Sequence, residues 1–159
     1  MSGMNDSCRT FRLSGLLAIL GITSYRLLAR SLDDDLSARL VELTQGLHGY
    51  LRFHGDTPSV DFDASDNDQA AFVHDATRYY QIYDAATGAL LVQSEAMEPL
   101  GLRFTPDEVR AFRERLVYHD VETDYGHIRI SNSLITPSPN HTYLLQVGAS
   151  LEPMDAALS

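Results

Sequence analysis

The chain has 159 residues, of which 44% are hydrophobic and 21% are charged. These proportions are ordinary for one folded domain with short extensions, and they exclude wholesale disorder. The formal net charge of −10 excludes a nucleic-acid partner, because phosphate binding needs clustered cations. The single cysteine, Cys8, cannot form an internal disulfide.

Charge is distributed unevenly along the chain. Residues 1–30 contain four arginines and one aspartate, whereas the remainder contains eight arginines and 21 acidic residues. A basic, apolar start on an acidic body is typical of a membrane-anchored protein whose start faces the cytoplasm and whose body is exported. We therefore expect residues 1–30 to contact a membrane.

The candidate anchor is short. Its uncharged stretch, Ser14–Tyr25, has 12 residues, and extending it over Leu13–Ala29 gives 17 with Arg26 inside. A spanning helix normally needs about 20 apolar residues, although an arginine near one end can reach the headgroups. A signal peptide and a buried or truncated helix are the competing interpretations, but no clear small-x-small cleavage site follows before the next helix. We favour an uncleaved anchor over residues 1–30.

A helix is predicted over Ser31–Phe53. Ser31 and Asp34 resemble a capping box, and acids load the first turn, where the helix dipole favours them. Leucines then follow at spacings of three or four, which places them on one face: Leu32, Leu36, Leu40, Leu43, Leu47 and Leu51. This leucine stripe has two interpretations. It packs on the chain's own sheet, or part of it pairs with the same helix of a second copy, and both can hold on different turns.

A β-hairpin is predicted in the middle of the chain. Tyr79–Tyr83 is rich in aromatic and β-branched side chains, Asp84–Gly88 has the composition of a tight turn, and Leu90–Val92 resumes the apolar run. Upstream, residues 55–68 are predicted to form an acidic loop, which lacks the glycine and glutamate of an EF-hand calcium site. Gln69–Ala76 is predicted to form a short helix or turn.

One helix and three strands are predicted in the C-terminal half. The helix would be capped by Thr105, begin at Pro106 and end near Leu116, with Val109 and Phe112 on its buried face. The strands and their connections follow in order: Tyr118–Thr123, a turn over 124–126, Ile128–Leu134 with alternating apolar residues, a loop over 136–140, and Tyr143–Val147. A last helix would begin in Leu151–Leu158. This order predicts an α+β fold with an antiparallel sheet.

The same succession resembles the extracytoplasmic sensor region of bacterial two-component sensor histidine kinases. Three stretches carry the resemblance: the basic, apolar start running into SLDDDLSARLVEL, the hairpin ATRYYQIYDAATGALLVQS, and GLRFTPDEVRAF followed by NSLITPSPNHTYLLQVGASLEPMDAAL. It implies a PAS-like domain over residues 31–150 in the periplasm and an anchor in the inner membrane. It also implies a homodimer held by membrane-proximal helices, the second of which would begin in 151–159.

The chain departs from that family in what it contains. Relatives have a longer first membrane helix than Leu13–Ala29, and beyond a segment like Leu151–Ala157 they continue into a second membrane helix, a phosphoaccepting histidine and an ATP-binding domain. None of these modules, and no glycine-rich phosphate loop, is present in the 159 residues. We therefore expect this chain alone not to be an enzyme and to need no cofactor.

A small ligand is predicted to lie against the sheet. Arg78, Tyr80, Tyr83 and Arg129 are the candidate residues, since arginine can pair with a ligand carboxylate. Aromatic residues in a strand are also typical of a core, which is the competing interpretation.

A metal site is the other candidate. The six histidines show no HxxxH spacing, and the single cysteine allows no CxxC pair. His119 and His127 could be neighbours across the turn at 124–126 and are the best pair. Scattered surface histidines are the favoured interpretation, so no metal is predicted.

These observations predict the sensor domain of a membrane-bound histidine kinase, which detects an unknown periplasmic ligand or ion and signals by helix movement. The alternatives are a stand-alone binding or dimerisation module from a truncated gene, a periplasmic metal-ion sensor domain, and a small metal-dependent enzyme.

Overall fold

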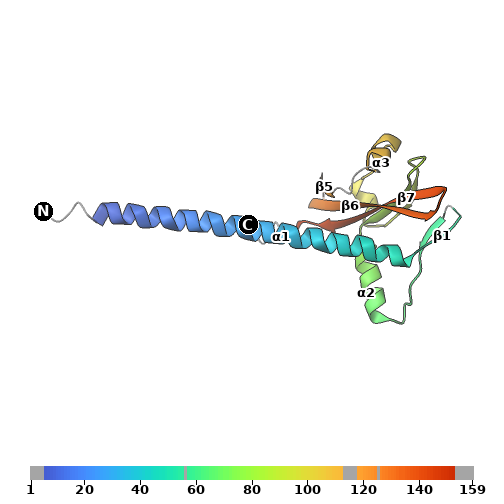
Figure 1. Ribbon diagram of the computed structural model, residues 1–159, viewed down its shortest axis with the longest axis horizontal. Coiled ribbons are helices and arrows are strands. Elements are labelled where there is room, and N and C mark those ends of the chain that lie inside the picture. The colour runs from blue at the N-terminus through green and yellow to red at the C-terminus, as the bar shows by residue number, and fades with distance from the viewer. Residues whose placement is uncertain (1–5, 56, 113–117, 125, 153–159) are drawn as a thin grey trace.

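The computed structural model describes residues 6–55, 57–112, 118–124 and 126–152, with side chains from residue 21 onward (Figure 1). The first half contains α1 (Asp6–Tyr50), β1 (Leu51–His54), β2 (Thr57–Val60), α2 (Asn67–Ala76), β3 (Tyr80–Asp84) and β4 (Leu90–Gln93). The second half contains η1 (Glu98–Leu100), α3 (Pro106–Phe112), β5 (Tyr118–Thr123), β6 (Gly126–Ser138) and β7 (His141–Ser150).

Helix α1 is continuous over 45 residues, and its N-terminal part projects away from the rest of the fold (Figure 1). The predicted start at Ser31 is therefore wrong. Residues 26–30, just before Ser31, are arginine, leucine and alanine, which favour a helix, and no proline occurs anywhere in α1. The predicted end at Phe53 is also wrong, because Leu51 to His54 pair with β2 as a strand.

Apolar side chains are exposed on the projecting part of α1. Ile22, Tyr25, Leu27 and Leu28 are each between 49% and 61% exposed. Within the described residues, no helix combines the length and the hydropathy needed to cross a membrane. The anchor over residues 1–30 stays a prediction.

The main sheet has five strands in the order β4-β3-β7-β6-β5, and every neighbouring pair is antiparallel. The α+β class and the antiparallel sheet are thus confirmed. The predicted hairpin is β3 and β4. At its turn, Asp84 Oδ1 accepts hydrogen bonds from the N–H groups of Ala86 and Thr87 at 2.8 and 2.7 Å. Gly88 has a φ of +73°, and an added Cβ would lie 2.4 Å from the Cα of Pro106. Both the conformation and the close approach require glycine.

Several other local predictions are confirmed. The short helix or turn predicted over Gln69–Ala76 is helix α2, which begins two residues earlier, at Asn67. Asp66 caps it by accepting hydrogen bonds from the N–H groups of Asp68 and Gln69. Helix α3 begins with a capping box, in which Glu108 Oε2 accepts from the backbone N–H of Thr105 at 2.7 Å and Glu108 N–H donates to Thr105 Oγ1 at 3.3 Å. Val109 is buried as predicted, whereas the predicted end near Leu116 lies outside the described residues.

The two predicted loops are shorter than expected. Residues 57–60 form β2, which pairs with β1, so the loop predicted over 55–68 is wrong in its first part. Strand β6 continues to Ser138 and pairs with β7, so the loop predicted over 136–140 reduces to the turn at 139–140. Ile128 and Ile130 are buried as predicted, but Leu134 is 38% exposed. The helix predicted over 151–158 lies almost entirely outside the described residues.

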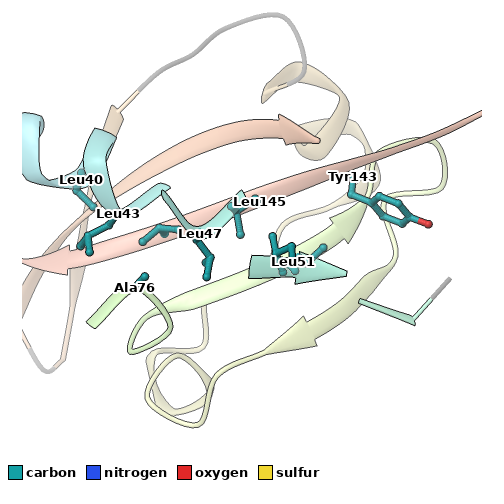
Figure 2. Close-up of a cluster of buried hydrophobic side chains, with 9 residues drawn as sticks. Leu40, Leu43, Leu47, Leu51, Ala76, Tyr143 and Leu145 are labelled. Atoms are coloured by element: carbon teal, nitrogen blue, oxygen red, sulfur yellow. The ribbon is translucent and has the colours of Figure 1, made fainter. Parts of the chain in front are cut away.

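Two layers cover the sheet: α1 and α2 lie on one face, and α3 lies on the other (Figure 1). Figure 2 shows the core on the α1 face, where four residues of the leucine stripe meet side chains of the sheet and of α2: Leu40, Leu43, Leu47, Leu51, Ala76, Tyr143 and Leu145. The interpretation that the stripe packs on the chain's own sheet is thus confirmed for its last four leucines. Helices α1 and α2 approach closely at Gly46, where an added Cβ would lie 2.3 Å from Phe72 Cζ.

Candidate functional site

The four residues predicted to bind a ligand do not converge. Arg78 is exposed, and its guanidinium lies 5.5 Å from the centre of the Tyr79 ring. Tyr80 packs against the core on the α1 face, whereas Tyr83 is buried in the cluster on the opposite face. The prediction fails because residues at an odd separation in a strand point to opposite faces of its sheet. Tyr80 instead lines a depression of about 390 Å³ beside α2.

Arg129 does pair with carboxylates, but they belong to the chain itself. Its Nε and Nη2 donate to the two carboxylate oxygens of Asp120 at 2.6 and 2.8 Å. Its Nη1 donates to Asp33 Oδ1 at 2.6 Å and to Ser37 Oγ at 3.1 Å. We call these four residues the Arg129 clamp. The clamp joins β5 and β6 to α1.

Opposite charges stabilise the clamp, in addition to its hydrogen-bond geometry. The Arg129 side chain is only 11% exposed, and its hydrogen bonds to Asp120 and Asp33 raise its pKa. The hydrogen bond from Arg129 lowers the pKa of Asp120. The fork of donors in a guanidinium matches the two oxygens of a carboxylate, so this contact fixes orientation as well as distance. Arg129 is therefore a structural link and is not available to a ligand carboxylate.

The clamp also marks where the last described strand ends. Arg129 lies opposite Ala149 in the register of β6 and β7, and Leu151 N–H donates to the carbonyl of His127 at 2.8 Å. The C-terminal end of β7 therefore lies at the same end of the sheet as Asp33 of α1.

The predicted histidine pair is also separated. His119 lies opposite Ile130 in the register of β5 and β6, and His127 lies opposite Glu122. His119 therefore faces the side of Ile130, and His127 faces the other side of the sheet. His119 stacks on Phe112 with 5.0 Å between ring centres, and His127 Nε2 is 3.7 Å from Glu122 Oε1. Across the described ranges, no three histidine, cysteine or acidic residues are placed to hold a metal ion.

A row of polar side chains crosses the face opposite α1, and sequence reasoning missed it. It has one residue from each strand of the main sheet: Gln93, Gln81, Gln146, Asn132 and His119. We call it the amide row. Gln81 and Gln146 are 0% exposed and Asn132 is 2% exposed. The sequence does show polar residues among the apolar residues of the strands. Only the register between the strands shows that these polar residues are hydrogen-bond partners.

The hydrogen bonds of the amide row run in one direction. Gln81 Nε2 donates to Gln146 Oε1 at 3.0 Å, and Gln146 Nε2 donates to Asn132 Oδ1 at 2.6 Å. Asn132 Nδ2 therefore donates to His119 Nδ1, which lies at 3.3 Å and accepts. The proton of the neutral ring is then on Nε2, which is buried and has no hydrogen-bond partner. Burial lowers the pKa of His119.

A groove of about 360 Å³ separates α1 from β5 and β6. We call it the α1 groove, and its walls come from two parts of the chain: Val41, Thr44, Gln45 and His48 on α1, and Tyr118, Ser131, Asn132 and Ser133 on the strands. No aspartate, glutamate or arginine is among these lining residues. The groove begins next to the clamp, since Ser131 is two residues beyond Arg129 on β6 and Val41 is one helical turn beyond Ser37.

No family model matches the chain, and neither a curated protein nor a solved structure matches it significantly. The Arg129 clamp, the amide row and the α1 groove are thus the features from which a function can be inferred.

Proposed function

We propose that this chain is the sensor domain of a membrane-bound two-component histidine kinase, and that α1 carries a periplasmic signal toward the membrane. The observation that supports this proposal is the continuity of α1. One helix runs from the basic N-terminal segment through Tyr50 and supplies leucines to the core of the domain. Because a helix moves as a unit, a displacement at the sheet also moves the projecting part. The PAS-like assignment of the sheet belongs to the same proposal.

Two contacts of different kinds couple α1 to the sheet. The leucine contacts are apolar and non-directional, so they tolerate small sliding movements. The Arg129 clamp is directional and would break or reform when α1 shifts relative to β6. The clamp would thus have a formed and a broken arrangement. A signalling domain needs two such states, because a stimulus can then favour one of them.

A second copy of the chain would pair with α1 on its projecting part. The dimer face predicted to include Leu40, Leu43 and Leu47 must be corrected, since these residues are buried in the chain's own core. The same spacing of three and four continues toward the N-terminus through positions that this core does not cover: Leu36, Leu32, Ala29, Tyr25 and Ile22. Tyr25 and Ile22 are 52% and 57% exposed. This is the spacing of a coiled-coil seam.

The first part of the test is topology. Cys8 is the only cysteine of the chain, and Asp61 lies on an exposed loop. In spheroplasts, a membrane-impermeant maleimide should label a Cys8→Ser, Asp61→Cys variant but should label the wild-type Cys8 only after permeabilisation. Labelling of Cys8 in intact spheroplasts would contradict the proposed orientation.

The second part is phosphorylation. Membranes that contain the full gene product should incorporate acid-labile phosphate from ATP on histidine, and Arg129→Gln should change the amount. Arg110→Gln is the matched control, because Arg110 pairs with Asp107 on its own helix α3 and not with the clamp. Membranes without phosphohistidine would overturn the kinase assignment and favour a stand-alone dimerisation module. Equal labelling in both variants would overturn the role of the clamp.

A further inference from the structure

The α1 groove has the size and the construction of a small-molecule site. Its volume of about 360 Å³ lies within the range of known ligand pockets, which is roughly 300–1,000 Å³. Helix α1 forms one wall and strands β5 and β6 form the other. An occupant would therefore touch both elements that the Arg129 clamp joins.

The wall on α1 presents apolar groups beside one amide, that of Gln45. Val41 presents an isopropyl group, and the hydroxyl of Thr44 donates to the carbonyl of Leu40 at 2.6 Å, so Thr44 offers its methyl group. His48 is half-buried, and burial lowers the pKa of its imidazole. Its Nε2 is buried without a hydrogen-bond partner, which disfavours a charge on the ring further. His48 is therefore a neutral aromatic surface at physiological pH.

The wall on the strands is polar but uncharged. Ser131 and Ser133 project from β6 toward α1, and Tyr118 adds a phenol from β5. Hydroxyl groups can both donate and accept hydrogen bonds. A ligand with an apolar face toward Val41 and a hydroxyl or amide toward the serines would satisfy both walls.

Charged ligands fit this groove poorly. Among the residues that the structure describes, none that lines the groove carries a charge that could compensate for the desolvation of an ion. The arginine next to the groove, Arg129, is already paired with Asp33 and Asp120. These two carboxylates at the clamp end would repel an anion.

We propose that the α1 groove binds a small uncharged organic molecule that has a ring-sized apolar face and a hydroxyl or amide group. The role of this molecule as a stimulus rests on the proposed function, whereas its binding does not. Bound between α1 and β6, it would favour one arrangement of the two elements and thereby change the geometry of the adjacent clamp.

The experiment measures binding to the purified chain by saturation-transfer NMR. The probes are two uncharged compounds, benzyl alcohol and benzamide, with benzoate and benzylamine as charged analogues of similar size. The uncharged probes should give saturable signals and the charged ones should not. Equal binding of benzoate, or no binding of either uncharged probe, would overturn the proposal.

A groove-filling variant tests whether the probes bind in the α1 groove. Ser133→Phe fills the groove and should weaken probe binding by about tenfold or more, because an added aromatic ring leaves too little space. Thr136→Phe, at an exposed position of the same strand, is the control and should bind as the wild type does. Far-UV circular dichroism shows whether each variant is folded, and if Ser133→Phe does not fold, Val41→Trp fills the groove from the other wall. Unchanged binding in a folded groove-filling variant would place the probes elsewhere and overturn the proposal.

This outcome is separable from that of the proposed function. Binding in the groove without phosphohistidine in membranes would contradict only the kinase assignment. Phosphohistidine without binding would contradict only the groove.

Discussion

The two faces of the main sheet are built differently. The α1 face is covered by an apolar core in which Leu40, Leu47 and Leu145 are fully buried, whereas the opposite face carries the amide row between two smaller apolar clusters. Apolar contacts are non-directional, whereas a buried row of amides requires each hydrogen-bond partner to stay in register. The comparison indicates that the α1 face is where the fold can adjust and that the opposite face fixes the sheet.

The largest expected effect is on the apolar core. Leu47→Ala should lower the free energy of unfolding by about 2–5 kcal/mol, because it leaves a cavity among fully buried neighbours. Leu36→Ala, on the same stripe but outside this core, is the matched variant and should cost less than about 1 kcal/mol. Urea denaturation measures both. Equal losses would show that the core extends further along α1 than described.

The next effect is on the amide row. Gln146→Leu keeps the size of the side chain but removes the acceptor for Gln81 Nε2 and one donor to Asn132 Oδ1. We expect the free energy of unfolding to fall by about 1–3 kcal/mol, the cost of a buried polar group that loses its partner, here Gln81 Nε2. The control is Gln45→Leu, at an exposed position on α1 at the α1 groove, which should change the free energy of unfolding by less than about 0.5 kcal/mol. A Gln146→Leu variant as stable as the wild type would show that the row does not fix the sheet.

A smaller effect is expected at the clamp. Arg129→Gln leaves Asp33 and Asp120 near each other without their cation, but both carboxylates are about half exposed and water can solvate them. The loss in unfolding free energy should be about 1–2 kcal/mol. Arg110→Gln should change stability by less than about 0.5 kcal/mol, because its ion pair is exposed. Thermal and urea unfolding of the two variants measure the difference.

The smallest effect is on pH dependence. Burial lowers the pKa of His119 from its ordinary value of 6.5, so below that pH the unfolded chain binds the proton more readily than the folded chain does. Stability therefore declines as the pH falls through 6.5 toward the lowered value, by at most about 1.4 kcal/mol per pH unit for one group. His119→Asn keeps an acceptor for Asn132 and should reduce this slope. An unchanged slope between pH 7.5 and 5.5 would contradict the buried neutral ring.

Local patterns predicted the parts of the fold that depend on neighbours in sequence. The leucine spacing predicted the buried face of α1, and the residue types from Asp84 to Gly88 predicted the hairpin turn. Ser31 has the residue type of a helix cap but lies inside α1. A capping side chain is needed only where backbone N–H groups lack a partner within the helix, and this is not the case at Ser31.

The candidate sites could not be predicted in the same way. The sequence predicts that Arg129 binds the carboxylate of a ligand, but its partners are Asp120 and Asp33 of the chain itself. Strand register brings Asp120 to Arg129, and the packing of α1 on the sheet brings Asp33. The amide row depends on the same long-range pairing. Single-sequence patterns contain residue types and spacing, but they do not contain the register between strands distant in the chain.

The most direct test of the coupling between the sheet and α1 is disulfide cross-linking in membranes. In a Cys8→Ser background, Tyr25→Cys places a thiol on the projecting part of α1, and two copies should cross-link under mild oxidation. We predict that adding Arg129→Gln changes the cross-linking rate, whereas adding Arg110→Gln leaves it unchanged. Cross-linking that is absent, or that is the same with both substitutions, would contradict the account.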